Sequence, residues 1–382
     1  MQKLKVLHTS DLHLGKRLGE ASLHEDQRYI LDQIKDILVD KKCDALVIAG
    51  DVYQRSDPSA ESMELFSSFI YDVSKLNIKV MAVSGNHDSG LRLSYFSKLV
   101  RDNGIFISDV FSGDIEKVTL YGADDVRVNF FLLPFLRPSD VKKYYPMSDQ
   151  ATFNEAVKTV IDRIDIDPEE INILIAHQYI TGSVTSESED SYIGGLDNVD
   201  SNIFDKFDYV ALGHLHRPQY INIEKIRYSG SPLKYSISEA DDVKSCVVVD
   251  LKSKNDISIE TVDLVPLHNV RDIHGLLQEV INMPYSEDYV RVELNDEEVP
   301  PDVRILLSST VFPNMIRFAV NNSKTSSETE IDISDNIENK SVLELFKDFY
   351  SLQNNGVEPD DARIKIINDI VESIGDSDNE TV

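Results

Sequence analysis

This chain has no long apolar run and only two cysteines. No stretch of the 382 residues is apolar over the length that crosses a bilayer, so we expect no membrane-spanning segment. The N-terminus runs straight into a strand pattern without an apolar core and a cleavage site, which predicts no secretory signal. The only cysteines, Cys43 and Cys246, form no paired motif. We expect both to be buried thiols in a reducing, cytoplasmic setting.

Positive charge is also scarce. The chain has 38 Lys and Arg against 67 Asp and Glu, a net charge of −29. Nucleic-acid binders are usually basic, so this balance argues against a free-standing nucleic-acid clamp. It does not exclude an enzyme that grips phosphate through bound cations or works with a basic partner. The length and ordinary composition predict a globular protein of two or three domains.

Strand and helix patterns alternate in the first part of the chain. Apolar runs at 4–8, 45–49 and 78–83 predict buried strands, and helical spacing at 25–40 and 61–76 predicts helices between them. Three successive β–α units predict a parallel sheet with helices packed on it. Strands at 128–133, 171–176 and 209–212, a helix at 153–164 and hairpins within 220–249 predict a second sheet.

The pattern changes after residue 265. A helix at 273–281, a strand at 289–294, a helix at 303–308 and a strand at 315–320 predict a small α/β module. A polar linker at 323–336 precedes two short amphipathic helices within 337–375, and an acidic, disordered tail is predicted at 376–382. The two apolar stripes are Val342, Leu345, Phe346 and Phe349, and Ile364, Ile367, Val371 and Ile374. Helices this short cannot bury such stripes alone, so we expect them to dock on this chain or on a partner.

Side chains that can bind metal follow five of the predicted strands. They are Asp11 and His13, Asp51, Asn86 and His87, His177, and His214 and His216. Each residue alone has an ordinary explanation as a helix cap, a turn residue or a core histidine. The whole set has no such ordinary explanation, because the carboxyl ends of strands in open α/β sheets meet at the edge where ligands bind. Imidazole, carboxylate and amide ligands without thiolate favour divalent first-row metals, in number sufficient for two ions that clamp a phosphoryl displacement.

The ordered motifs resemble the calcineurin-like metallophosphoesterase superfamily. They are Asp11-x-His13, Gly50-Asp51, Gly85-Asn86-His87-Asp88, His177 and Gly213-His214-Leu215-His216. More narrowly, the chain resembles the bacterial SbcD nuclease subunits, because Asp88 stands where phosphatase relatives mostly carry Glu. The segments 205–209 and 228–236 also resemble that family. The fold implied is a two-sheet α/β sandwich flanked by helices, followed by a capping domain and partner-binding helices.

The resemblance implies a domain and a role for each segment and site residue. It implies a nuclease domain at 1–265, a capping domain at 266–322 and partner-binding helices at 337–375. One ion would sit on Asp11, His13, Asp51 and His216, and the other on Asp51, Asn86, His177 and His214. Both ions would be divalent, with manganese the usual one, although the ligands alone also suit iron or zinc. His87 would act on the leaving oxygen, and Asp88 would hold the imidazole of His87 in the right tautomer.

The resemblance also implies partners. These are DNA and an SbcC-type ATPase with long coiled coils, with a homodimer inside a heterotetramer. The implied activity is ATP-dependent 3′ to 5′ exonuclease action on double strands and endonuclease action on single strands and hairpins. The helices at 61–76 and 92–101 are candidate dimer faces, although their stripes equally suit a core.

Two features depart from the family pattern. Gln54 stands where members often have an acid or His, so a positioning role there is in doubt. The loop 182–195, with Glu187, Glu189 and Asp190, is unusually acidic for a rim that meets DNA. Two other hypotheses stay open: a phosphatase or small-molecule phosphodiesterase on the same scaffold, and a non-catalytic scaffold that only recruits the ATPase. The second of these is disfavoured by the complete ligand set.

Overall fold

The computed structural model describes residues 4–122, 126–189 and 198–322, with a few isolated positions between 347 and 364. Two compact units are distinguished, Met1–Leu294 with Val299–Ala319, and Asn295–Glu298 with Val320–Val382. The linker, amphipathic helices and acidic tail expected after residue 322 lie outside the described residues, apart from those few positions. No helix within the described ranges is long and apolar enough to cross a membrane.

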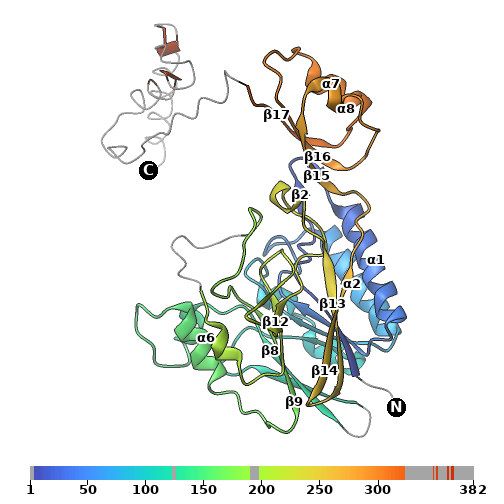
Figure 1. The fold of residues 1–382 in the computed structure, drawn as a ribbon. Helices are drawn as coiled ribbons and strands as arrows, with labels where there is room; N and C mark the ends of the chain where they lie inside the picture. Colours follow the sequence, from blue (N-terminus) through green and yellow to red (C-terminus); the bar gives the residue numbers. More distant parts are fainter. Residues whose placement is uncertain are drawn as a thin grey trace. The chain divides into compact units, whose positions relative to one another are not determined.

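Two six-stranded sheets form the main body (Figure 1). The first runs β14 (Asp256–Asp263), β13 (Ser245–Ser253), β1 (Leu4–Thr9), β4 (Ala45–Ala49), β5 (Lys79–Val83) and β6 (Ile105–Ile107). The second runs β11 (Gln219–Ile221), β12 (Ile223–Tyr228), β10 (Tyr209–Gly213), β9 (Ile171–His177), β8 (Arg127–Leu133) and β7 (Glu116–Tyr121). In each sheet four neighbouring strands are parallel, β1-β4-β5-β6 and β12-β10-β9-β8. A small hairpin of β2 (Arg17–Leu18) and β3 (Ala21–Ser22) lies apart from both.

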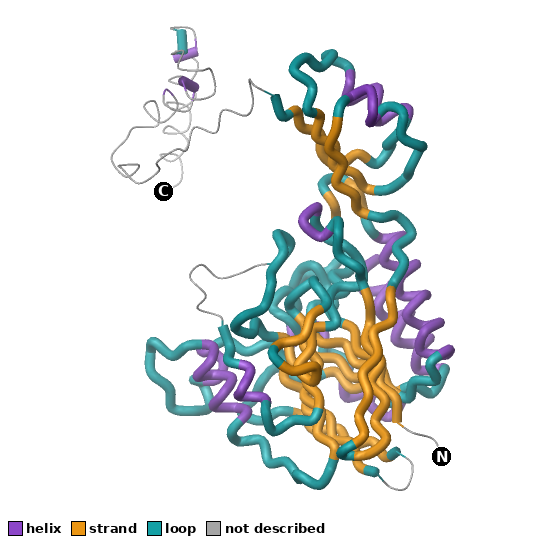
Figure 2. The backbone as a smooth tube through the Cα atoms, in the orientation of Figure 1, coloured by secondary structure: helices purple, strands orange, loops and turns teal. Residues whose placement is uncertain are grey.

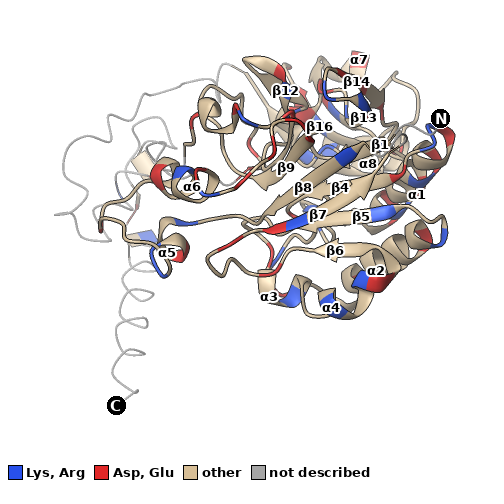
Figure 3. Ribbon diagram, turned by 90° about the horizontal axis from the view of Figure 1, so that it is seen from below, with Lys and Arg blue, Asp and Glu red and all other residues tan. Residues whose placement is uncertain are grey.

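Helices cover the outer faces of the two sheets, with the strands gathered between them (Figure 2). The first sheet carries α1 (His24–Asp40) and α2 (Ala60–Lys75), followed by α3 (Gly90–Leu93), α4 (Ser97–Val100) and the 3-10 turn η1 (Arg101–Asn103). The second carries α5 (Pro138–Val141), α6 (Phe153–Ile161) and the 3-10 turn η3 (Ser201–Phe204), and η4 (Ile237–Glu239) precedes β13. The α/β sandwich predicted from the sequence is therefore confirmed. Lys, Arg, Asp and Glu lie mostly on the helices and loops (Figure 3).

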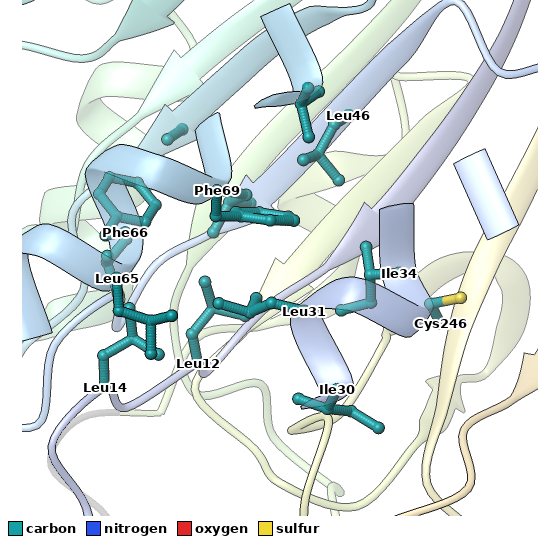
Figure 4. Packing of buried hydrophobic residues seen from close by; sticks show 14 of the residues in the cluster. Leu12, Leu14, Ile30, Leu31, Ile34, Leu46, Leu65, Phe66, Phe69 and Cys246 are labelled. Carbon is teal, nitrogen blue, oxygen red and sulfur yellow. The ribbon is translucent and has the colours of Figure 1, made fainter. Parts of the chain in front are cut away.

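Strand alternation explains this layering. In β4, Ala45, Val47 and Ala49 face the second sheet, while Leu46 and Ile48 face the helices. Successive side chains of a strand point to opposite faces, so a strand that is apolar throughout must be covered on both sides. Leu46 accordingly packs against Phe69 of α2 and Ile34 of α1 in the outer core of the first sheet (Figure 4).

Three predictions for the main body and its neighbouring module were wrong in detail. Only the first part of the segment 220–249 joins the second sheet, as the hairpin β11–β12. The later strand β13 crosses to the first sheet and pairs antiparallel with β1, Val6 opposite Val249. The expected helix at 92–101 is broken into α3, α4 and η1. The expected helix at 273–281 is instead β15 (Val270–Gly275) followed by α7 (Leu277–Val280). Its apolar spacing suits a helix, but pairing with a neighbouring strand decides the conformation.

The small module after residue 265 has its own core. Its three-stranded sheet runs β15, β16 (Tyr289–Leu294) and β17 (Met315–Val320), with α8 (Val303–Thr310) beside it. Val290, Val292 and Leu294 of β16 are fully buried with Leu307 and Phe312. The predicted strand–helix–strand order from 289 to 320 is confirmed, and the boundary at 265/266 stays a prediction.

Candidate metal centre

The carboxyl ends of five parallel strands meet where the two sheets touch. Asp11 and His13 follow β1, Asp51 follows β4, residues 85–88 follow β5, His177 ends β9, and His214 and His216 follow β10. Next to this edge, His8 of β1 bridges the sheets, with Nδ1 2.9 Å from Tyr209 Oη and Nε2 3.1 Å from the Leu212 carbonyl oxygen. The carbonyl fixes Nε2–H as a donor, so Nδ1 accepts from Tyr209.

The local backbone at this edge is strained. Seven described non-glycine residues have positive φ, and four of them are Asp11 (52°), His13 (43°), Asp51 (47°) and His214 (104°). Such conformations cost about 1–3 kcal/mol each and persist where the surrounding structure enforces them, most often at functional sites. The strain therefore marks the same residues that the sequence motifs select.

Glycines give the ligands room to approach one another. A Cβ on Gly85 would lie 2.0 Å from Asp51 Oδ1, and one on Gly213 would lie 1.8 Å from the Ala49 carbonyl oxygen. A Cβ on Gly50, whose φ is +87°, would lie 2.1 Å from His177 Nδ1. The glycines of the three motifs are therefore required by close contact and, at Gly50, also by backbone conformation.

One group of ligand atoms surrounds Asp51 and Asn86. His177 Nε2 lies 3.4 Å from Asp51 Oδ2 and 3.0 Å from Asn86 Oδ1. His214 Nδ1 also lies 3.0 Å from Asn86 Oδ1. Because His177 Nδ1 lies 2.8 Å from the Ala49 carbonyl, its proton belongs there, and the Nε2 lone pair of the neutral ring faces two oxygen acceptors. Lone pairs that converge in this way suit a bound cation.

A second group lies on the other side of Asp51. His13 Nε2 is 3.5 Å from Asp51 Oδ2 and 3.1 Å from His216 Nε2. Asp11, His13 and His216 have ligand atoms within 4.8 Å of one another, as do Asp11, Asp51 and His177. Asp11, His13, Asp51, His177 and His216 are at most 2% exposed and His214 is 7% exposed, so the surroundings have few competing waters. The donor set of imidazole, carboxylate and amide fits two divalent ions that share Asp51.

The pKa values show how charge is balanced here without a cation. Burial raises the pKa of Asp11 to about 6, against the opposing effect of His177 and His216. Burial would raise the pKa of Asp51 too, but the rings of His177, His13 and His87 outweigh it and hold that pKa well below its usual range. The pKa of His177 is raised to about 9, because Asp51 outweighs the cost of burial. Both shifts have one cause, a buried Asp51 carboxylate that requires positive charge beside it, and a bound cation would supply such a charge.

His87 and Asp88 stand beside these groups. Asp88 accepts backbone N–H bonds from Val52 (3.1 Å), Tyr53 (2.9 Å) and Gly85 (3.0 Å), so it ties the loop after β4 to the loop after β5. The imidazole of His87 has its Nδ1 3.2 Å from the Gln54 carbonyl oxygen and its Nε2 3.9 Å from Asp51 Oδ2. The ring of His87 thus has the Gln54 carbonyl oxygen as a hydrogen-bond partner, and the role of Asp88 in setting the tautomer of His87 stays a prediction.

Sequence reasoning missed several residues around His214 and His216. The ring of Phe135 lies nearly parallel to that of His214, at 18° and 6.4 Å between centroids. Behind His216 lie Glu239 and Lys244, 0% and 4% exposed, joined by an ion pair of 2.6 Å. Charged residues in a polar segment are expected on the surface, so no sequence signal marks this buried pair.

The comparisons with known proteins agree with this geometry. The family model described as calcineurin-like phosphoesterase matches residues 4–218, and one described as type 5 capsule protein repressor C-terminal domain matches residues 264–354. The chain is 36% identical over 354 residues to the SbcD subunit of nuclease SbcCD from Staphylococcus epidermidis, covering 90% of this chain and 92% of that protein.

Two solved structures resemble the chain at low sequence identity. TT1561 of Thermus thermophilus matches with a TM-score of 0.37 and 12% identity, over 69% of this chain and 99% of its own. A dimetal phosphatase from Danio rerio matches with a TM-score of 0.38 and 10% identity, over 68% of this chain and 99% of its own. On the family models and the 36% identity, this chain belongs to the calcineurin-like phosphoesterase family, among the SbcD proteins.

Proposed function

We propose that this chain is a metal-dependent DNA nuclease subunit that hydrolyses phosphodiester bonds at the site around Asp51. The observation that carries the proposal is the convergence of His177, Asn86 and Asp51 on one side, and His13 and His216 on the other, about a shared carboxylate. Membership in the family of the SbcCD nuclease's SbcD subunit supports DNA rather than a small phosphate ester as the substrate.

The residues divide between two ions. Asp11, His13, Asp51 and His216 would hold one, and Asp51, Asn86, His177 and His214 the other, with manganese the preferred ion. When bound, such ions neutralise the phosphodiester and activate the attacking water. Asp51 would contribute a ligand to both ions, which accounts for the need to keep its carboxyl ionised although it is buried.

His87 is the proposed acid for the leaving oxygen. Its Nδ1–H donates to the Gln54 carbonyl, so the tautomer is fixed and Nε2 is the atom that exchanges a proton. Its side chain is 16% exposed, against 1% for that of His13, so it is the more accessible to a substrate. Asp88 acts by holding the loop that carries His87, through its three backbone hydrogen bonds.

A basic hollow beside the site suits the DNA backbone. A cavity of about 550 Å³ is lined by the segment 14–17 directly after His13 and by residues 54, 55, 57–59 and 62 after Asp51. Lys16, Arg17 and Arg55 contribute three cationic side chains to it, against one carboxylate, that of Asp57, which is paired with Arg92. In a chain of net charge −29 this gathering gives phosphates a local attractive surface next to the metal ligands.

The proposal includes the partners of the complex. An SbcC-type ATPase would bind through 337–375 and confer ATP-dependent 3′ to 5′ exonuclease action on double strands and endonuclease action on single strands and hairpins. Such an enzyme serves DNA repair, recombination and replication in the cytoplasm. Leu91 (71% exposed), Tyr95 (75%) and Leu99 (73%) expose apolar area after Asp88, which supports a homodimer at this face within a heterotetramer.

The experiment that tests the proposal uses a labelled hairpin DNA with manganese, with and without the ATPase partner. We expect cleavage that is lost in Asp51→Asn and kept in the control Asp36→Asn, which makes the same change at an exposed position. Cleavage of p-nitrophenyl phosphate, with no DNA cleaved under any condition, would show a phosphatase instead. Deleting 337–382 should abolish partner binding and leave manganese-dependent cleavage of short single strands.

A further inference from the structure

The buried pair Glu239 and Lys244 is the feature least explained by the proposed metal sites. Taking two charges out of water costs several kcal/mol per ion unless every donor and acceptor is satisfied. Lys244 Nζ donates to Glu239 Oε2 (2.6 Å), to the His216 carbonyl oxygen (2.7 Å) and to Ser231 Oγ (3.1 Å). All three ammonium protons are therefore used, and one of them fixes the backbone of His216.

The other end of the pair reaches the ring of His216. Glu239 Oε1 lies 3.6 Å from His216 Nδ1, and Ser188 Oγ lies 2.5 Å from both atoms. A hydroxyl can accept one hydrogen bond and donate another. Since Glu239 is ionised and can only accept, Ser188 donates to Glu239 and accepts from Nδ1–H.

This chain of hydrogen bonds determines the tautomer of His216. With the proton on Nδ1, the lone pair lies on Nε2, which faces His13 Nε2 at 3.1 Å within the proposed metal site. The backbone N–H of His216 in turn donates to Glu189 Oε1 at 2.5 Å. The N–H, the ring and the carbonyl of one ligand are thus each held by a different residue.

We propose that Ser188 and Glu239 are positioning residues that set the tautomer of His216, and so the occupancy of the metal ion that His216 would hold. The inference rests on the proposed function only for the identity of the ion. It gives a purpose to part of the acidic loop 182–195, because Ser188 and Glu189 face inward onto His216.

The variant that tests this is Ser188→Ala, which removes the relay but leaves the Glu239–Lys244 pair intact. Long-range ¹H–¹⁵N spectra of the metal-free protein, labelled in histidine and assigned with His216→Asn, report the tautomer directly. We expect a single Nδ1–H tautomer in the wild type and a mixture in Ser188→Ala. Ser188→Thr, which keeps the hydroxyl, should restore the wild-type spectrum.

Calorimetry with manganese gives the second readout. The wild type should bind two ions, and Ser188→Ala should bind one of them roughly 10–100-fold more weakly. Ser258→Ala is the control, since it removes an exposed hydroxyl from the edge strand β14, and its two affinities should be unchanged. Glu239→Gln should also lower the affinity for that ion. Because this variant also breaks the ion pair and lowers stability, its affinity is interpreted only together with its melting temperature.

Two results would overturn the inference. They are an unchanged tautomer in Ser188→Ala, or two manganese affinities equal to those of the wild type. A wild type that binds manganese but cleaves no DNA would refute the nuclease alone, and the tautomer and affinity readouts would still decide the role of Ser188. Absence of manganese binding in the wild type would refute both.

Discussion

Replacing Gly85 by Ala tests whether close packing around Asp51 is what makes the site work. The added Cβ would meet Asp51 Oδ1 at 2.0 Å and the Asp51 backbone nitrogen at 2.5 Å, whereas real Cβ contacts stay beyond 3.0 Å. The carboxylate or the loop must therefore move by about 1 Å. The φ of Gly85 is outside the left-handed region, so the effect is steric and involves no backbone conformational penalty.

Neither side of this contact can give way cheaply. Asp51 Oδ1 accepts the backbone N–H of His87 at 2.9 Å, and Gly85 N–H donates to Asp88, which also holds Val52 and Tyr53. A displacement of about 1 Å at a reacting group costs on the order of 100-fold in rate, and overpacking a tight site costs about 1–3 kcal/mol of stability.

Gly122→Ala is the matched control. Its Cβ would have Leu4 Cβ as its nearest neighbour, at 3.6 Å, which is an ordinary contact. Manganese affinity by calorimetry, cleavage rate and melting temperature should fall in Gly85→Ala and stay at the wild-type values in Gly122→Ala. Equal manganese affinity and cleavage rate in the two variants would refute the idea that this contact positions Asp51.

Three further predictions concern His87, His8 and the face that carries Leu91. His87→Ala should keep both metal affinities and reduce cleavage by about 10²–10⁴-fold; loss of an ion would make His87 a ligand. Burial lowers the pKa of His8 to about 3, so the folded protein stays neutral there while the unfolded chain protonates below pH 6.5. The free energy of unfolding should therefore fall as the pH drops from 6.5 towards 3, by about 2 kcal/mol between pH 7 and pH 5. Denaturant titrations over this pH range should show a shallower fall in His8→Gln than in the wild type. Equal slopes in the two proteins would contradict this prediction. Leu91→Glu with Leu99→Glu should convert a dimer to a monomer by light scattering, whereas Tyr121→Glu, at a side chain 63% exposed on β7, should not; an unchanged mass would contradict the proposed dimer face.

The parallel strands β1, β4 and β5 and the grouping of the candidate site residues could be predicted because their signals are local. β4 and β5 are short apolar runs followed by a glycine and a polar candidate ligand, and the carboxyl ends of parallel strands lie at one edge of the sheet. The same logic brings His177 to Asp51, 126 positions away in the chain, without any knowledge of the contact.

What failed depends on partners distant in sequence. The apolar run in β13 indicates a strand but not which sheet it joins, and its pairing with β1 depends on packing between the sheets. The apolar positions in 273–281 fit a helix until β16 offers a pairing edge. The motif also does not reveal that the Asp88 carboxylate accepts hydrogen bonds from the backbone of a loop some 35 residues earlier.

Net charge misleads in a related way, because it counts charged residues without regard to where their side chains point or what they pair with. Glu189 belongs to a loop whose composition is too acidic for a DNA-facing rim, yet its carboxylate bonds the backbone of His216. The charge of Glu239 is buried and balanced by Lys244. The Glu239–Lys244 pair carries no net charge, while the cations at 16, 17 and 55 line a cavity beside the site. An acidic chain can therefore bind a polyanion where divalent ions and a few basic side chains dominate the local potential.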